Sequence, residues 1–287
     1  MLDRTPTYRM VWTDLDGTLL DGESCVAEAT QNVLCDIVGS HCPLVLATAR
    51  GAGERIPYQS LPGPLYLVAC GGAHILERST VGELLDLHVH GFTQAQCEGF
   101  VRAAEEHGVT LWLCQTDKIF VKRGAVGAAE SKVIETQFPS DPDHADIFCD
   151  VEVLDEKLME RRPAIEICVV TPEADAFVAR VGATLSALGL QAFSWAPEPL
   201  VSVKLAGVDK ASGLRWLCDH LGCSPDHAVA FGDGANDVPM LRLAGLGIAM
   251  ENAGEAAKGA ANVVSEWSNV QHGVAKELLR LRGEGVL

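Results

Sequence analysis

The order of apolar and polar positions in the first 80 residues or so predicts alternating strands and helices. Short apolar runs, of the kind that form buried strands, end at Asp14, Ala47 and Ala69. Between the first two runs lies a helical stretch from Val26 to Val38. This strand–helix–strand order is typical of a parallel sheet with right-handed crossovers.

The pattern changes after about Glu77. Thr93 is a plausible N-cap for a helix that ends before Gly108, and alternating runs follow it. The strands expected in this segment are Val109–Cys114, Lys118–Lys122, Ala164–Val170, Gln191–Trp195 and Leu200–Lys204, with a second helix at Glu173–Leu188. The acidic span 141–160 is expected to be a solvated surface. We therefore predict an α+β domain, residues 83–199, inserted into the first domain, residues 1–82 and 200–287.

The α/β pattern then resumes. The helices expected here are Lys210–Leu221, Val238–Leu243, Ala253–Gly259 and His272–Leu281, and the strands are Ala228–Phe231, Leu246–Met250 and Asn262–Val264. The predicted fold class is α/β, with a three-layer parallel-sheet core and an inserted α+β domain.

Composition narrows the choice of partners. The chain carries 22 Lys+Arg against 39 Asp+Glu, a formal net charge of -17. This balance argues against nucleic acid, which binds clustered basic residues. No stretch approaches the roughly 18 apolar residues of a membrane span, and the first eight residues do not resemble a secretory signal. The 10 cysteines include no C-x-x-C pair, so reduced thiols and a cytoplasmic location are expected.

Polar side chains gather where the predicted core strands end. Asp14 and Asp16 are two residues apart and so point to one face of a strand. The other polar positions at strand ends or helix starts are Thr48, Lys210, Asp233, Asn236 and Asp237. In open parallel sheets the carboxyl ends of the strands form the ligand-binding edge, so these residues are expected to meet.

Three carboxylates and one lysine in a crevice describe a site for a hard cation. Oxygen ligands with open positions suit Mg²⁺, which also binds substrate phosphate. One carboxylate can then attack phosphorus, and a second acid can protonate the leaving oxygen. Thr48 and Lys210 would hold the phosphoryl oxygens.

The motifs Asp14-Leu-Asp16-Gly17-Thr18, Thr48-Ala49-Arg50, Lys210 and Gly232-Asp233-Gly234-Ala-Asn236-Asp237 resemble the four motifs of the haloacid dehalogenase (HAD) superfamily. Their order and spacing are similar to the Cof-like branch, in which a type-two α/β cap domain lies between the second and third motifs. The resemblance covers the predicted core, and the cap matches only in length and element order. It implies a Rossmann-like catalytic core and a hydrolase of the phosphatase type.

The resemblance also implies roles in catalysis and metal binding. It makes Asp14 the nucleophile, which forms an aspartyl-phosphate and binds Mg²⁺. Asp16 is the implied general acid/base and offers its backbone carbonyl to the metal. Asp233 is the remaining metal ligand, and Gly17 and Asp237 support the site.

Phosphate binding is implied for Thr48, Ala49, Arg50, Lys210 and Asn236. For Arg50, the residues by themselves leave two readings open, anion binding and a purely structural cap. The sequence departs from the family pattern at Gly71-Gly72-Ala73, where the Cof-like branch usually has Asn-Gly-Ala. The missing amide removes a polar group near the substrate, so the relatives' substrate preferences are not transferred.

We therefore predict a Mg²⁺-dependent phosphatase that hydrolyses a small phosphorylated metabolite, with a sugar phosphate as the expected substrate. The first alternative is a phosphomutase similar to phosphomannomutases, which share the cap type and both aspartates. The second is a non-catalytic protein that binds a phosphorylated metabolite, against which the intact Asp14, Asp16, Lys210 and Asp233 argue.

Overall fold

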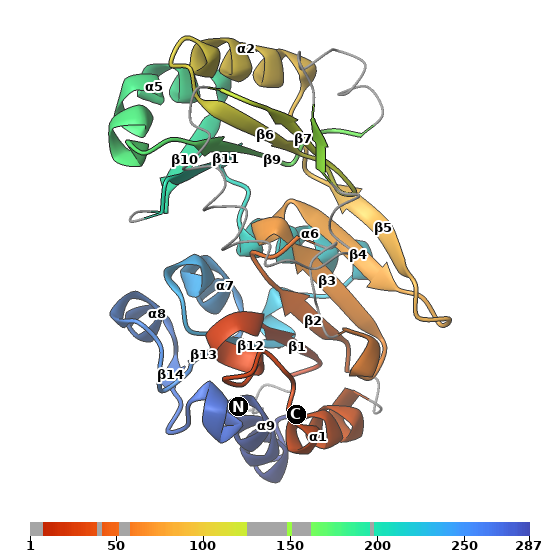
Figure 1. Ribbon diagram of the computed structural model, residues 1–287. Coiled ribbons are helices and arrows are strands. Elements are labelled where there is room, and N and C mark those ends of the chain that lie inside the picture. Colours follow the sequence, from red (N-terminus) through yellow and green to blue (C-terminus); the bar gives the residue numbers. More distant parts are fainter. Residues whose placement is uncertain (1–7, 39–41, 52–57, 125–147, 151–161, 196–197) are drawn as a thin grey trace. The chain divides into compact units, whose positions relative to one another are not determined.

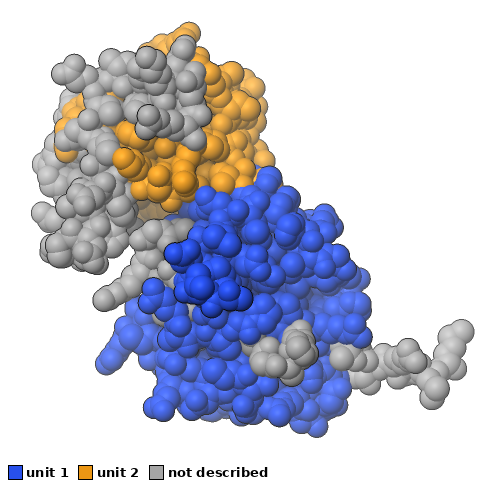
Figure 2. Space-filling view, turned by 90° about the vertical axis from the view of Figure 1, so that its right-hand side faces the viewer, with its two compact units in different colours: residues 1–88, 208–287 blue, residues 89–207 orange. Residues whose placement is uncertain are grey.

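The computed structural model describes residues 8–38, 42–51, 58–124, 148–150, 162–195 and 198–287. It divides into two compact units, shown in Figures 1 and 2. Unit 1 consists of residues 1–88 and 208–287, and unit 2 of residues 89–207. The sequence analysis placed the inserted domain at 83–199. That unit 1 acts as the catalytic core and unit 2 as its cap remains a prediction.

Unit 1 is built on an eight-stranded sheet with the order β14-β13-β12-β1-β2-β3-β4-β5. Its strands are β1 (Met10–Thr13), β2 (Leu44–Ala47), β3 (Leu65–Ala69), β4 (His74–Arg78), β5 (Leu84–Val89), β12 (Ala228–Gly232), β13 (Leu246–Ala249) and β14 (Val263–Val264). Strands β14 to β3 of this order are parallel, and β4 is antiparallel to β3. Every residue of β1, β2 and β3 is buried, which explains their continuous apolar runs.

The helices of unit 1 form two groups, and the helices within each group contact one another. They are α1 (Glu28–Val38) with α9 (Gly273–Gly283), and the series α6 (Lys210–Leu221), α7 (Val238–Leu243) and α8 (Glu255–Ala260). Helix α6 has a complete capping box, in which Asp209 accepts a hydrogen bond from the backbone N–H of Ser212. Gly222 ends the helix in the left-handed conformation. The local sequence thus determines that α6 begins at Lys210.

The register of the sheet brings the functional strand ends together. Thr13 of β1 pairs with Phe231 of β12 on one side and with Leu46 of β2 on the other. The next residue, Asp14, donates its backbone N–H to the carbonyl of Phe231 at 3.0 Å. The turns after β1, β2 and β12 therefore share one edge of the sheet.

Unit 2 has a six-stranded sheet with the order β10-β11-β9-β6-β7-β8. Its strands are β6 (Thr110–Cys114), β7 (Ile119–Lys122), β8 (Phe148–Asp150), β9 (Glu166–Val170), β10 (Leu190–Ser194) and β11 (Leu200–Leu205), and its described helices are α2 (Gln94–Glu105) and α5 (Ala174–Leu188). All described pairings are antiparallel except β7 with β8. Phe100, Phe177 and Ile167 lie in the core between the helices and the sheet.

The predicted fold class is confirmed by this parallel-sheet unit and the inserted α+β unit. Thr93 caps α2 as predicted. Strand β4 was not predicted, because the apolar run ends at Ala69 and His74–Arg78 mixes polar with apolar residues. Apart from 148–150, the acidic span 141–160 lies outside the described residues. None of the helices that the structure describes has the length and apolar composition needed to cross a membrane.

Candidate active site

Three carboxylates meet at the carboxyl edge of the unit 1 sheet. Asp14 follows β1, and Asp233 and Asp237 follow β12, and oxygen atoms of all three lie within 4.8 Å of one another. Asp14 is 6% exposed and Asp237 is fully buried. Like charges this close repel strongly unless cations neutralise them.

Lys210 supplies part of that neutralisation. Its side chain is 1% exposed, and its Nζ lies 2.7 Å from Oδ1 of Asp14 and 2.6 Å from Oδ1 of Asp237. Burial lowers the pKa of Lys210, but the two carboxylates outweigh this effect and leave the pKa raised. The lysine is therefore a permanent cation that bridges the turns after β1 and β12.

Asp14 shows the remaining imbalance of charge. Burial, with a smaller contribution from the nearby Asp237, raises its pKa to about 7, although Lys210 acts in the opposite direction. One ammonium group thus faces three carboxylates. A divalent cation with oxygen ligands would remove the excess negative charge and keep Asp14 ionised. The donor set therefore fits Mg²⁺.

Gly17 and Thr18 shape the surroundings of Asp233. Thr18 donates its hydroxyl to Oδ1 of Asp233 at 2.9 Å. Gly17 has φ +73°, and a Cβ at this position would lie 2.3 Å from Oδ2 of Asp233. Burial raises the pKa of Asp233, and the Thr18 hydrogen bond opposes this. The glycine is therefore required both by the backbone and by the closeness of the carboxylate.

Asp237 contacts both the turn that carries Asp233 and the side chain of Lys210. Its Oδ2 accepts hydrogen bonds from the backbone N–H groups of Asp233 and Gly234, at 3.0 and 2.9 Å. Its other oxygen binds Lys210. The buried carboxylate thus fixes the turn that carries Asp233 and holds the lysine at the same time.

Asp16 and Arg50 form a two-point ion pair. Nε of Arg50 donates to Oδ2 of Asp16 at 2.8 Å, and Nη2 donates to Oδ1 at 2.5 Å. The Asp16 side chain is 55% exposed and that of Arg50 22%. The structure therefore shows Arg50 holding the carboxyl that the sequence analysis assigned to proton transfer.

The other predicted phosphate-binding residues lie on the turns after β2 and β12. Thr48 is buried, and its hydroxyl oxygen accepts the backbone N–H of Arg50 at 3.1 Å. Ala49 and Asn236 are exposed. Their roles in phosphate binding remain predictions.

Two contacts were missed from the sequence. Thr18 was not assigned to Asp233, although it lies directly beside Gly17 in the first motif. Asn252 donates its side-chain N–H to the carbonyl of Gly17 at 2.8 Å. The stretch Glu251-Asn252-Ala253-Gly254 after β13 was the available signal.

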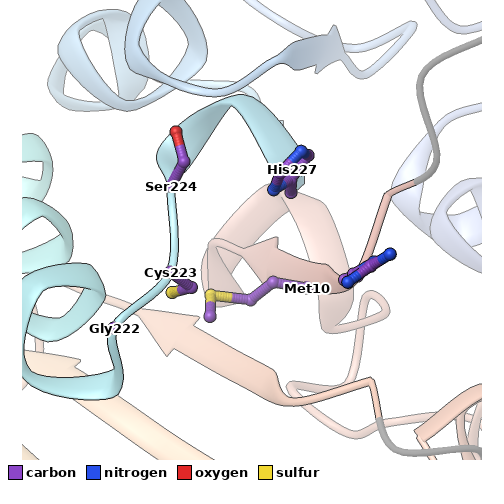
Figure 3. A pocket seen from close by; sticks show the side chains of 6 residues that line it. Met10, Gly222, Cys223, Ser224 and His227 are labelled. Atoms are coloured by element: carbon purple, nitrogen blue, oxygen red, sulfur yellow. The ribbon is translucent and has the colours of Figure 1, made fainter.

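A separate cavity lies at the opposite end of β1. It has a volume of about 400 Å³ and is lined by Arg9, Met10, Gly222, Cys223, Ser224 and His227 (Figure 3). Met10 begins β1, whereas Asp14 follows its last residue. The cavity is therefore no part of the carboxylate site.

Comparison with known proteins decides the family. The model of the haloacid dehalogenase-like hydrolases matches residues 11–278. The chain belongs to this family. The match includes every residue of the candidate site. The HAD resemblance predicted from the four motifs is thereby confirmed.

Relatives of this HAD-like hydrolase match over nearly its full length. A plant protein named Endoribonuclease YBEY, chloroplastic (Arabidopsis thaliana) is 26% identical over 96% of this chain. The chain spans only 47% of that plant protein. The 5-amino-6-(5-phospho-D-ribitylamino)uracil phosphatase YcsE of Bacillus subtilis is 22% identical, with 94% of both chains covered.

A solved structure of a HAD phosphatase from Bacteroides thetaiotaomicron aligns with a TM-score of 0.79 at 25% identity. The alignment covers 100% of this chain and 98% of that one. The family is one of hydrolases, and the Bacillus subtilis relative and this solved structure are both named as phosphatases.

Proposed function

We propose that this HAD-like hydrolase is a Mg²⁺-dependent phosphatase that acts on a small phosphorylated metabolite through an aspartyl-phosphate on Asp14. The observation that carries the proposal is the buried Lys210, which bridges Asp14 and Asp237 beside Asp233. A buried cation next to an attacking carboxylate offsets the negative charge of an incoming phosphoryl group.

Asp14 begins the reaction by attacking phosphorus. An oxygen of its carboxylate forms a bond to phosphorus while the bond to the substrate oxygen breaks. Asp16 gives a proton to the leaving oxygen. A water molecule then attacks phosphorus, Asp16 takes a proton from it, and Asp14 is released together with inorganic phosphate.

The metal would be held by the carboxylates of Asp14 and Asp233 and by the backbone carbonyl of Asp16. When bound, Mg²⁺ supplies positive charge that keeps Asp14 ionised and draws the phosphate toward it. Lys210 and Thr48 bind phosphoryl oxygens. The ion pair of Asp16 with Arg50 loosens as substrate enters, which frees Asp16 for proton transfer and directs Arg50 to the phosphate.

For the substrate we propose a phosphate ester of a sugar or sugar alcohol. The name of the full-length Bacillus subtilis relative supports this class, because it describes a phosphate carried on a ribityl chain. Ala49 and Asn236 are exposed on the turns after β2 and β12, where we expect them to contact the incoming ester.

The test compares the wild type with Asp14→Asn by measuring phosphate release from a panel of sugar and sugar-alcohol phosphates. With MgCl₂ present, we expect the substitution to lower kcat by about 10⁴-fold or more. Asp219→Asn, an exposed aspartate on α6, is the matched control and should retain wild-type rates. Turnover by Asp14→Asn at the wild-type rate contradicts the mechanism.

A second arm of the same experiment supplies a sugar bisphosphate activator. Net phosphate release that disappears with EDTA supports the phosphatase. Isomerisation of the sugar phosphate without net phosphate release would instead identify a phosphomutase.

A further inference from the structure

The turn between β3 and β4 has an unusual backbone. Its residues Cys70, Gly71 and Gly72 have φ values of +53°, +63° and +108°. Cys70 is 5% exposed. A buried non-glycine residue in this region of φ is strained, and such strain persists only where surrounding contacts impose it. The contacts on both sides of the turn therefore indicate what it does.

One side of the turn binds the loop after β2. The backbone N–H of Cys70 donates to the carbonyl of Arg50 at 2.8 Å, and that of Gly71 donates to the carbonyl of Thr48 at 2.8 Å. Two consecutive hydrogen bonds thus fix the segment that carries three of the predicted phosphate-binding residues, Thr48, Ala49 and Arg50.

The other side of the turn lies against the start of α6. A Cβ on Gly72 would lie 2.0 Å from the carbonyl oxygen of Asp209, 2.5 Å from its carbonyl carbon and 3.2 Å from the backbone nitrogen of Lys210. The approach is mutual, since a Cβ on Gly213 of α6 would lie 3.1 Å from Cα of Gly72. Backbone packs directly on backbone, with no room for a side chain.

We propose that Gly72 is a positioning residue that sets Lys210 relative to the Thr48–Arg50 loop. This inference rests on the proposed function, because it assigns the turn to the phosphate-binding groups of that site. The three-residue turn joins the second and third motifs without contributing a side chain of its own. Lys210 Nζ then reaches Asp14 because its backbone position is fixed from outside helix α6.

The expected loss of activity on substituting Gly72 follows from its close approach to Asp209. A methyl group on Gly72 would lie 2.0 Å from the Asp209 carbonyl oxygen, which has to move by about 1.4 Å or more to reach an ordinary packing distance. Lys210 is the next residue and moves with it. A misplacement of about 1 Å in a catalytic group lowers the rate by about 100-fold.

The experiment measures kcat and KM of Gly72→Ala and of a matched control, Gly222→Ala, for the best substrate found in the panel. Gly222 also has a positive φ, +66°, and ends the same helix, but a Cβ there would meet nothing within 4 Å. Both variants carry backbone strain, and only the first displaces Lys210. We expect kcat/KM to fall about 100-fold for Gly72→Ala, mainly in kcat, and less than about threefold for Gly222→Ala.

Gly213→Ala gives a milder version of the same displacement. Its added Cβ would lie 2.6 Å from Cγ1 of Val68 and 3.1 Å from Cα of Gly72, and alanine favours the helix. This variant is expected to fold and to lose about tenfold in kcat/KM. All assays are run at temperatures where circular dichroism shows each variant to be folded. A folded Gly72→Ala or Gly213→Ala with wild-type kcat/KM overturns the inference.

Binding of inorganic phosphate in the presence of Mg²⁺, followed by calorimetry, separates this inference from the proposed function. It needs no turnover. Weaker phosphate binding by Gly72→Ala than by Gly222→Ala supports the positioning role even if the wild type hydrolyses nothing in the panel. Equal binding by both variants contradicts the positioning role even if the wild type is an active phosphatase.

Discussion

Replacing Lys210 with Met tests the electrostatic reasoning about the site most directly. Methionine has nearly the length of the lysine stem, so the packing changes little. What disappears is the cation that lies 2.7 Å from Asp14 and 2.6 Å from Asp237. Both carboxylates are then left in a buried site without their counter-ion.

Removing one partner of a buried ion pair costs about 3–5 kcal/mol, because the remaining charge stays desolvated. We expect Lys210→Met to lose that much free energy of unfolding near pH 8 with EDTA present. The assay is urea unfolding followed by circular dichroism. Lys276→Met, which removes an exposed lysine of the same unit, is the control and should lose at most about 1 kcal/mol.

The pKa of Asp14 predicts how the stability deficit of Lys210→Met changes with pH. Burial raises the pKa of Asp14 to about 7, and Lys210 acts to lower it, so the substitution raises this pKa further. A carboxyl whose pKa is higher in the folded than in the unfolded protein stabilises the fold at low pH and loses that contribution as pH rises through the folded value. The deficit of Lys210→Met should therefore shrink between about pH 8 and pH 5.5.

Magnesium should restore part of the lost stability in the variant, because it neutralises the same carboxylates. Two results would refute the reasoning. One is a loss in stability no larger than that of Lys276→Met. The other is a deficit that grows as the pH falls.

Two more predictions concern the metal. Gly17→Ala should weaken Mg²⁺ binding by about tenfold or more in calorimetry, because its Cβ would lie 2.3 Å from Oδ2 of Asp233. Gly82→Ala, with φ +90° and nothing within 4 Å of its Cβ, is the control, and equal affinities in the two variants would exclude this explanation. In the wild type, Mg²⁺ affinity should fall by up to about tenfold per pH unit below the Asp14 pKa of about 7, since the carboxyl must lose its proton to bind the metal. Calorimetry in buffers of different ionisation enthalpy should detect the released proton near pH 6, and an affinity that does not change with pH contradicts the prediction.

The sequence by itself determined the family, the fold class and the identity of the residues at the sheet edge. These features are local in the chain. Buried parallel strands appear as short apolar runs, and Asp14, Thr48 and Asp233 each follow such a run directly. The capping box that begins α6 at Lys210 is also encoded within four residues.

The tertiary structure decided how these residues interact. The pairing of Asp16 with Arg50 joins positions 34 residues apart, and that of Thr18 with Asp233 joins positions 215 apart. The pattern of apolar and polar residues in the sequence does not predict such contacts, because sheet register and turn geometry create them. The same holds for Gly72, which follows the departure at Gly71 and itself matches the glycine of the Asn-Gly-Ala pattern. Only the structure shows that the backbone of Asp209 and Lys210 lies so close to Gly72 that no side chain fits between them.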